Sequence, residues 1–255
     1  MKTLKFLRCV LVAAAVLFAC SAAARADWPN LVTKWSQGPV NPAGWGFASC
    51  MNPSPMDYIT ADDFLCTMTG PIQEITFSGF NGPSTSFRVT FWTDVPRTPV
   101  DESHPGSLIY DRIIGPADPL DPLKIGWQQI SDYDYRINLA QSDWFYQNGS
   151  PSNPVTYWLG IQGVASQFYW QAQDPSLSTW GDDAAFASEQ IGIAPWSNWG
   201  WTTADDPEVY DGPFPAGWYN SADMVFTLNG TPEPATICLL GAGAVGMLLR
   251  RRRRK

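Results

Sequence analysis

The stretch FRVTFWT, residues 87–93, decides the fold class. Phe87, Val89 and Phe91 share one face of the extended chain, and the residues between them share the other, because successive side chains of a β-strand point to opposite sides. Three large apolar side chains on one face predict a strand that covers a hydrophobic core.

The same alternation recurs on both sides of this stretch. It is clear in residues 133–139 and 155–161. Weaker strands are expected at Leu31–Trp35, Tyr58–Leu65, Ile72–Phe80, Leu108–Ile114, Gln167–Gln171 and Ala222–Leu228. Pro-rich segments such as Gly115–Pro122 and Asp205–Pro215 predict loops, since proline cannot donate to a ladder. Nine or so short strands with polar turns predict an all-β body, folded as a two-sheet β-sandwich or jelly roll.

The first 26 residues read as a signal peptide that is removed after export. Three bases precede a short apolar run, and Ala-Arg-Ala at 24–26 fits a cleavage site before Asp27. The apolar run is too short to span a bilayer. A lipoprotein-type cut before Cys20 is the weaker alternative, because Phe18 is bulky for such a site.

Export changes how the cysteines are interpreted. Cys50 and Cys66 are the only cysteines between the leader and the C-terminal tail. An even count in an exported domain predicts one disulfide between them, worth about 3 kcal/mol. A metal-binding pair is the alternative, and it lacks neighbouring ligands.

The body, Asp27–Thr231, is strongly acidic. It holds six bases against 23 acids, a formal charge of −17. Phosphate backbones would repel such a surface, so we expect no nucleic-acid partner. Carboxylates can hold Ca²⁺, and Asp205, Asp206 and Glu208 are weak candidates for a structural calcium site, although no EF-hand spacing is present. No other cofactor is expected.

Catalysis is not expected. The chain has one histidine, His104, in the turn-like segment SHPG at 103–106, so the usual Ser-His-Asp, Cys-His and His-rich zinc sites are excluded. A carboxylate glycoside hydrolase is the remaining, less favoured enzyme class. Adjacent pairs such as Asp62 and Asp63 are poor acid-base dyads on a strand, because neighbours point to opposite faces.

All thirteen tryptophans lie in the body, and Trp196, Trp199 and Trp201 are clustered. Exposed indole faces can stack on sugars, so a carbohydrate-binding module is a second function to consider. The competing interpretation, which we favour, is that tryptophans fill the core with their N–H groups hydrogen-bonded.

The C-terminal tail has three parts: Pro232-Glu233-Pro234, fifteen uncharged residues at 235–249, and six bases at 250–255. It resembles the sorting signal of bacterial PEP-CTERM proteins. The resemblance implies Sec-dependent export, a membrane hold through the tail, and processing by an exosortase-like membrane enzyme. It also links the chain to the cell surface and to an exopolysaccharide or biofilm matrix.

The body is similar to planctomycete-type ectodomains that carry such tails. The matching pieces are KWSQ at 34–37, ADDFLC at 61–66, SHPG at 103–106 and WGDDA at 180–184. This resemblance implies a β-rich ectodomain without assigning its chemistry.

The uncharged run is short for a transmembrane helix. Fifteen residues give a helix of about 22 Å, against a hydrocarbon core of roughly 30 Å. Snorkelling arginines and local thinning can supply the difference, and the bases should stay cytoplasmic, leaving the body outside. We therefore expect a signal peptide at 1–26, an ectodomain at 27–230 and a sorting signal at 231–255, with Asn229–Pro234 as a linker.

Overall fold

The computed structural model describes residues 31–40, 46–51, 57–83, 85–98, 103–121, 123–173, 184–188, 202–203 and 223–231. Thr33–Gly230 forms one compact unit. The expected signal peptide and the expected helix at 235–249 lie outside the described residues. Within the described part, no helix has both the length and the apolar character needed to cross a membrane.

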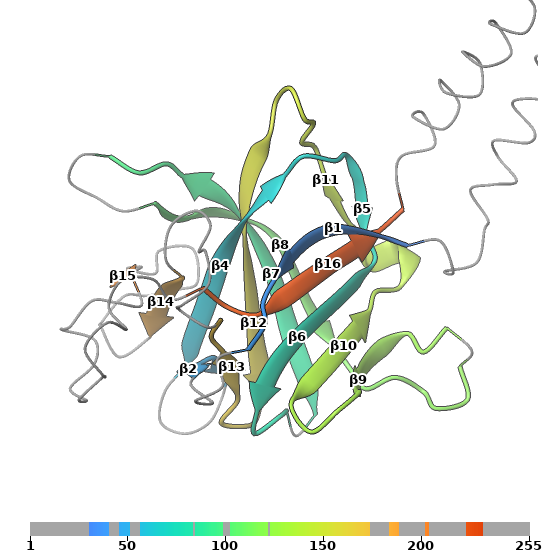
Figure 1. Cartoon of the computed structure of the whole chain (residues 1–255). Coiled ribbons are helices and arrows are strands. Elements are labelled where there is room, and N and C mark those ends of the chain that lie inside the picture. Colours follow the sequence, from blue (N-terminus) through green and yellow to red (C-terminus); the bar gives the residue numbers. More distant parts are fainter. Residues whose placement is uncertain are drawn as a thin grey trace, which may run out of the picture. The chain divides into compact units, whose positions relative to one another are not determined.

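The described chain is all-β, with two larger sheets and a two-stranded one (Figure 1). The first sheet follows the order β1-β16-β6-β10-β9, with β13 joined to β6 and β2 to β13. Its strands are β1 (Val32–Gln37), β2 (Gly46–Ala48), β6 (Glu74–Phe80), β9 (Gly126–Gln129), β10 (Asp134–Asn138), β13 (Tyr169–Gln171) and β16 (Phe226–Gly230).

The second sheet follows the order β15-β14-β4-β3-β12-β7-β8. Its strands are β3 (Cys50–Met51), β4 (Tyr58–Cys66), β7 (Ser86–Val95), β8 (His104–Ile114), β12 (Val155–Val164), β14 (Ala185–Ser188) and β15 (Thr202–Thr203). The small sheet pairs β5 (Gly70–Ile72) with β11 (Phe145–Gln147), and one 3-10 turn, η2, spans Gln141–Asp143.

The main core lies between the two larger sheets. The stretch that decides the fold forms β7, and Phe87, Val89 and Phe91 are fully buried, as predicted. Phe87 meets Phe77 of the opposite sheet edge to face, with ring centroids 4.9 Å apart. Aromatic rings dominate this core, and such pairs add stability beyond the area they bury.

The other face of β7 is also buried, which alternation alone did not predict. Trp92 packs in a second, smaller cluster, whose other members are Ile59, Ala61, Trp158, Ala185 and Ala187. On the same face Arg88 is 5% exposed, and its guanidinium makes two hydrogen bonds to the carboxylate of Asp111, at 2.8 and 2.7 Å.

Most strand positions were predicted, and two expected boundaries were not observed. The expected strand Ile72–Phe80 is divided at Gln73, because β5 pairs with β11 whereas β6 pairs with β10 and β16. The expected turn at 103–106 is wrong, since His104 and Pro105 begin β8 and pair with Val95 and Asp94. Among the strands that the structure describes, β8 is the last of its sheet, where a proline needs no ladder partner on its outer side.

The predicted disulfide is also wrong: Cys50 and Cys66 are buried, free thiols. Cys50 pairs across from Tyr58, at the start of β4, whereas Cys66 ends the same strand. Eight residues of extended chain separate the two positions by about 26 Å. A disulfide needs Cα atoms roughly 4–7 Å apart, so these thiols cannot meet in this fold.

Candidate functional site

The described residues nearest to the predicted sorting signal are those of β16. This strand lies inside the sheet, between β1 and β6 (Figure 1). It pairs antiparallel with β6 in a register that runs from Phe226 opposite Phe77 to Asn229 opposite Glu74. Phe226 and Leu228 alternate into the main core. The last strand of the fold is therefore a central strand, held on both sides.

Side chains reinforce this pairing near the end of the strand. Asn229 Nδ2 donates to Glu74 Oε1 at 2.7 Å, and the Asn229 carbonyl accepts from Gln73 N at 2.9 Å. On the other side, the hydroxyls of Thr227 and Ser36 of β1 lie 2.9 Å apart in a hydrogen bond. Asn229 was expected in a linker, and it is instead a paired strand residue.

Gly230, the last residue of β16, is enclosed by backbone. A Cβ at this position would collide with the Pro71 carbonyl and approach Lys34 Cε to 2.7 Å. Lys34 cannot swing away freely, because it is buried and its Nζ donates to the Thr69 carbonyl at 2.8 Å. Only glycine fits here, so the fold specifies the residue that precedes the tail.

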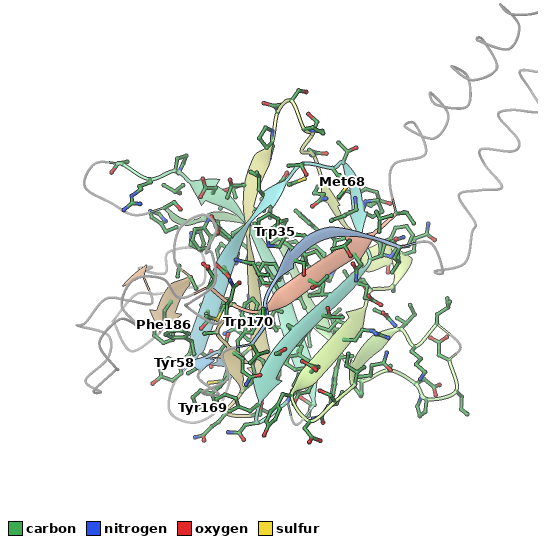
Figure 2. The ribbon with its side chains drawn as sticks, in the orientation of Figure 1. Trp35, Tyr58, Met68, Tyr169, Trp170 and Phe186 are labelled. Atoms are coloured by element: carbon green, nitrogen blue, oxygen red, sulfur yellow. The ribbon has the colours of Figure 1, made fainter. Side chains whose placement is uncertain are left out.

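The segment before β16 is anchored as well. Trp170 Nε1 donates to the Val225 carbonyl at 3.0 Å, and Met224 N donates to Asp62 Oδ2 at 2.6 Å. Figure 2 shows Trp170 beside the start of β16. Residues 223–230 thus carry tertiary bonds along their whole length.

The Asp62 carboxyl is completely buried at the junction of β4 with this segment. Burial raises its pKa well above the ordinary aspartate range, and the nearby Asp223 and Asp63 carboxyls raise it further. Asp63 N donates back to Asp62 Oδ1 at 2.9 Å. In β4, Asp63 stands opposite Trp158, whose side chain belongs to the second cluster. Asp62 therefore serves as a structural tie between β4 and the C-terminal segment.

The metal candidates cannot be placed. Asp205, Asp206 and Glu208 lie outside the described residues. Among the residues that the structure does describe, no group of three or more His, Cys, Asp or Glu side chains is arranged to hold a metal ion.

The tryptophans that the structure describes follow the core interpretation. Trp92, Trp158 and Trp170 are fully buried, and three others are partly buried. All six indole N–H groups donate hydrogen bonds, to acceptors on Gln37, Thr90, Thr85, Leu139, Asp94 and Val225. Trp196, Trp199 and Trp201 lie outside the described side chains, so the expected sugar-stacking cluster stays a prediction.

The sequence did not predict the close contacts of Gly230 with Pro71 and Lys34, or the hydrogen bond that ties Asp62 to Met224. Both join segments more than 150 residues apart, and local alternation carries no information on such pairings. The one available signal was Gly230 itself, because a glycine at the end of an apolar, alternating strand often marks a close backbone approach.

Comparison with known families divides the chain at Gly230, where β16 ends. Residues 33–229 match a domain of unknown function, DUF7901. Residues 231–254 match the PEP-CTERM protein-sorting motif, as the resemblance implied. Among curated proteins and among solved structures, none matches the chain significantly. Pro232, Glu233 and Pro234 fall inside the matched motif and outside the described residues.

Proposed function

We propose that this chain, which belongs to the DUF7901 family and ends in a PEP-CTERM sorting motif, is a non-enzymatic surface or matrix protein. The acidic body, a β-sandwich, is the cargo. The tail holds it at the membrane until an exosortase-like enzyme recognises Pro232-Glu233-Pro234. The processed body is then displayed at the cell surface or in an exopolysaccharide matrix.

The observation that carries this proposal is the junction between body and tail. β16 ends at Gly230, and the matched sorting motif begins at Thr231. A sorting motif placed directly after the last core strand is well positioned to direct the sorting of the whole folded unit. The described body adds buried, hydrogen-bonded tryptophans and a buried carboxyl with a structural role, which suit a stable passenger.

Replacement of Pro232, Glu233 and Pro234 by alanine tests the proposal in a host that has an exosortase. We expect the variant to keep its unprocessed mass and to accumulate in the membrane fraction, with less protein at the surface. A composition-matched control exchanges Pro232 and Glu233, and it should fail in the same way if recognition depends on order. A second control, Asp118→Ala in an exposed loop, should be processed like the original chain. Normal mass and surface yield in the alanine variant would refute sorting by this motif.

A further inference from the structure

The end of the body from which the tail leaves has an unusual surface. It is built by residues 67–73 and 139–154, which we call the exit surface. Pro71 lies against Gly230, and Tyr146 of β11 pairs across from Pro71. Leu139 N donates to the Gln73 carbonyl at 2.9 Å, so both segments belong to the same end of the sheet.

The exit surface is nearly free of charge. Asp143 is the one Asp, Glu, Lys, Arg or His among its 23 residues, and its carboxylate pairs with Arg112 Nε at 3.1 Å. Four described bases lie in or beside this end of the body, and four described acids balance their charge. The bases are Lys34, Arg112, Lys124 and Arg136, and the acids are Glu74, Asp118, Asp121 and Asp143. The other residues that the structure describes in the body include two bases and eight acids, a formal charge of −6.

Aromatic side chains stand on this neutral end. The Tyr146 side chain is 56% exposed, and its ring lies 6.5 Å from the partly buried ring of Trp144. Trp144 Nε1 donates to the Leu139 carbonyl at 3.1 Å, which fixes the indole in place. Tryptophan and tyrosine are the residues that favour the boundary between lipid headgroups and hydrocarbon.

The length of the chain beyond β16 restricts what this surface can meet. Four residues, 231–234, separate Gly230 from the uncharged run at 235–249. Fully extended, that distance is at most about 17 Å. A membrane that holds the run would therefore keep the exit surface close by. An acidic body near an anionic bilayer is repelled least when its neutral end faces the lipid.

We propose that the exit surface rests on the phospholipid headgroups of the membrane that holds the tail, with Tyr146 and Trp144 at the interface. This rests on the proposed function in one respect, the membrane hold. The acidic remainder is then turned away from the lipid. The extended chain from Tyr133 to Leu139, which contains β10, places the far end about 20 Å from the exit surface. That exceeds the roughly 8 Å screening length at physiological ionic strength.

The test compares two tyrosines of nearly equal exposure, Tyr146 in β11 on the exit surface and Tyr133 just before β10 at the far end. Tyr146→Cys marks the exit surface, and Tyr133→Cys marks the far end, where the original side chain is 57% exposed. The chain without its leader, which carries Cys9 and Cys20, has Cys238→Ser to remove the tail thiol and is labelled with an environment-sensitive fluorophore. It is reconstituted into vesicles of phosphatidylethanolamine and phosphatidylglycerol, some of them containing a shallow lipid quencher. Cys50 and Cys66 are buried and should not react in the folded chain.

We expect the label at position 146 to shift to the blue and to be quenched by the lipid, and the label at position 133 to do neither. Equal behaviour of the two labels on vesicles that carry the chain would overturn the inference and leave the proposed function standing. Failure of the chain to float with vesicles would overturn both. Protection of position 146 only when an exosortase is added would assign the surface to a protein and refute the lipid contact.

Discussion

The close contacts of Gly230 with Pro71 and Lys34 give the sharpest prediction about the junction between the body and the tail. In the variant Gly230→Ala, the added methyl group meets the carbonyl of Pro71 and the side chain of Lys34. Pro71 is held in β5 by its pairing with β11, so the backbone must shift to admit the methyl. Overpacking of this kind costs about 1–3 kcal/mol. For a domain of this size, that lowers the melting temperature by roughly 2–12 °C.

Gly115→Ala is the matched control. Its backbone φ is not in the left-handed region, and an added Cβ would meet nothing within 4 Å. We expect it to be neutral, or to stabilise the protein by a few tenths of a kcal/mol through the unfolded state. The assay is thermal unfolding of the purified full chain in mild detergent, followed by the fluorescence of the buried tryptophans. Equal melting temperatures for the two variants would refute the reasoning that the fold requires glycine before the tail.

Three further outcomes are expected. Asp111→Ala should reduce the free energy of unfolding by about 2 kcal/mol in urea titrations, because the buried Arg88 guanidinium loses both its bonds to that carboxylate. Asp62 has a raised pKa in the folded state, so its contribution to stability is complete below the ordinary aspartate pKa and is lost as the pH rises through the folded pKa. Asp62→Asn should therefore flatten the fall in unfolding free energy as the pH rises above the ordinary aspartate pKa of about 4. Cys50 and Cys66 should resist a thiol reagent in the folded chain and react in denaturant, with no change in melting temperature on adding a reductant.

Each of these outcomes has a control or a contrary result. Asp143→Ala removes the carboxylate of a more exposed ion pair, to Arg112, and should cost less than about 1 kcal/mol. An equal loss for both aspartates would contradict the account of Arg88. A pH profile that is unchanged in Asp62→Asn would show that other groups cause the pH dependence. Detection by mass spectrometry of a peptide pair linked through Cys50 and Cys66 would show that the disulfide exists and would contradict the strand register.

Local sequence patterns predicted the strands because a β-strand records its burial in every second residue. Phe87, Val89 and Phe91 gave that signal clearly, and so did Tyr135 and Ile137 in β10, which are buried as their positions suggest. The all-β class follows from such runs without knowledge of how the strands pair.

Long-range pairing could not be predicted in the same way. The pairing of β1 with β16 places the first and last strands of the body side by side, and no local pattern encodes that choice. The prediction of a disulfide was wrong for the same reason, since Cys50 and Cys66 are 16 residues apart in sequence and lie at opposite ends of β4 in space. The second buried face of β7 was missed because Arg88 and Thr90 are polar, and only their partners explain their burial.

The central claim is that the tail directs the sorting of an intact folded body. Its most direct test is the mass of the surface-extracted chain, measured with and without the exosortase of the host. The account predicts that the enzyme-dependent form ends beyond Gly230, keeps all of β16 and lacks the basic residues 250–255. A surface form that retains Lys255, or one that ends within Phe226–Gly230, would contradict it.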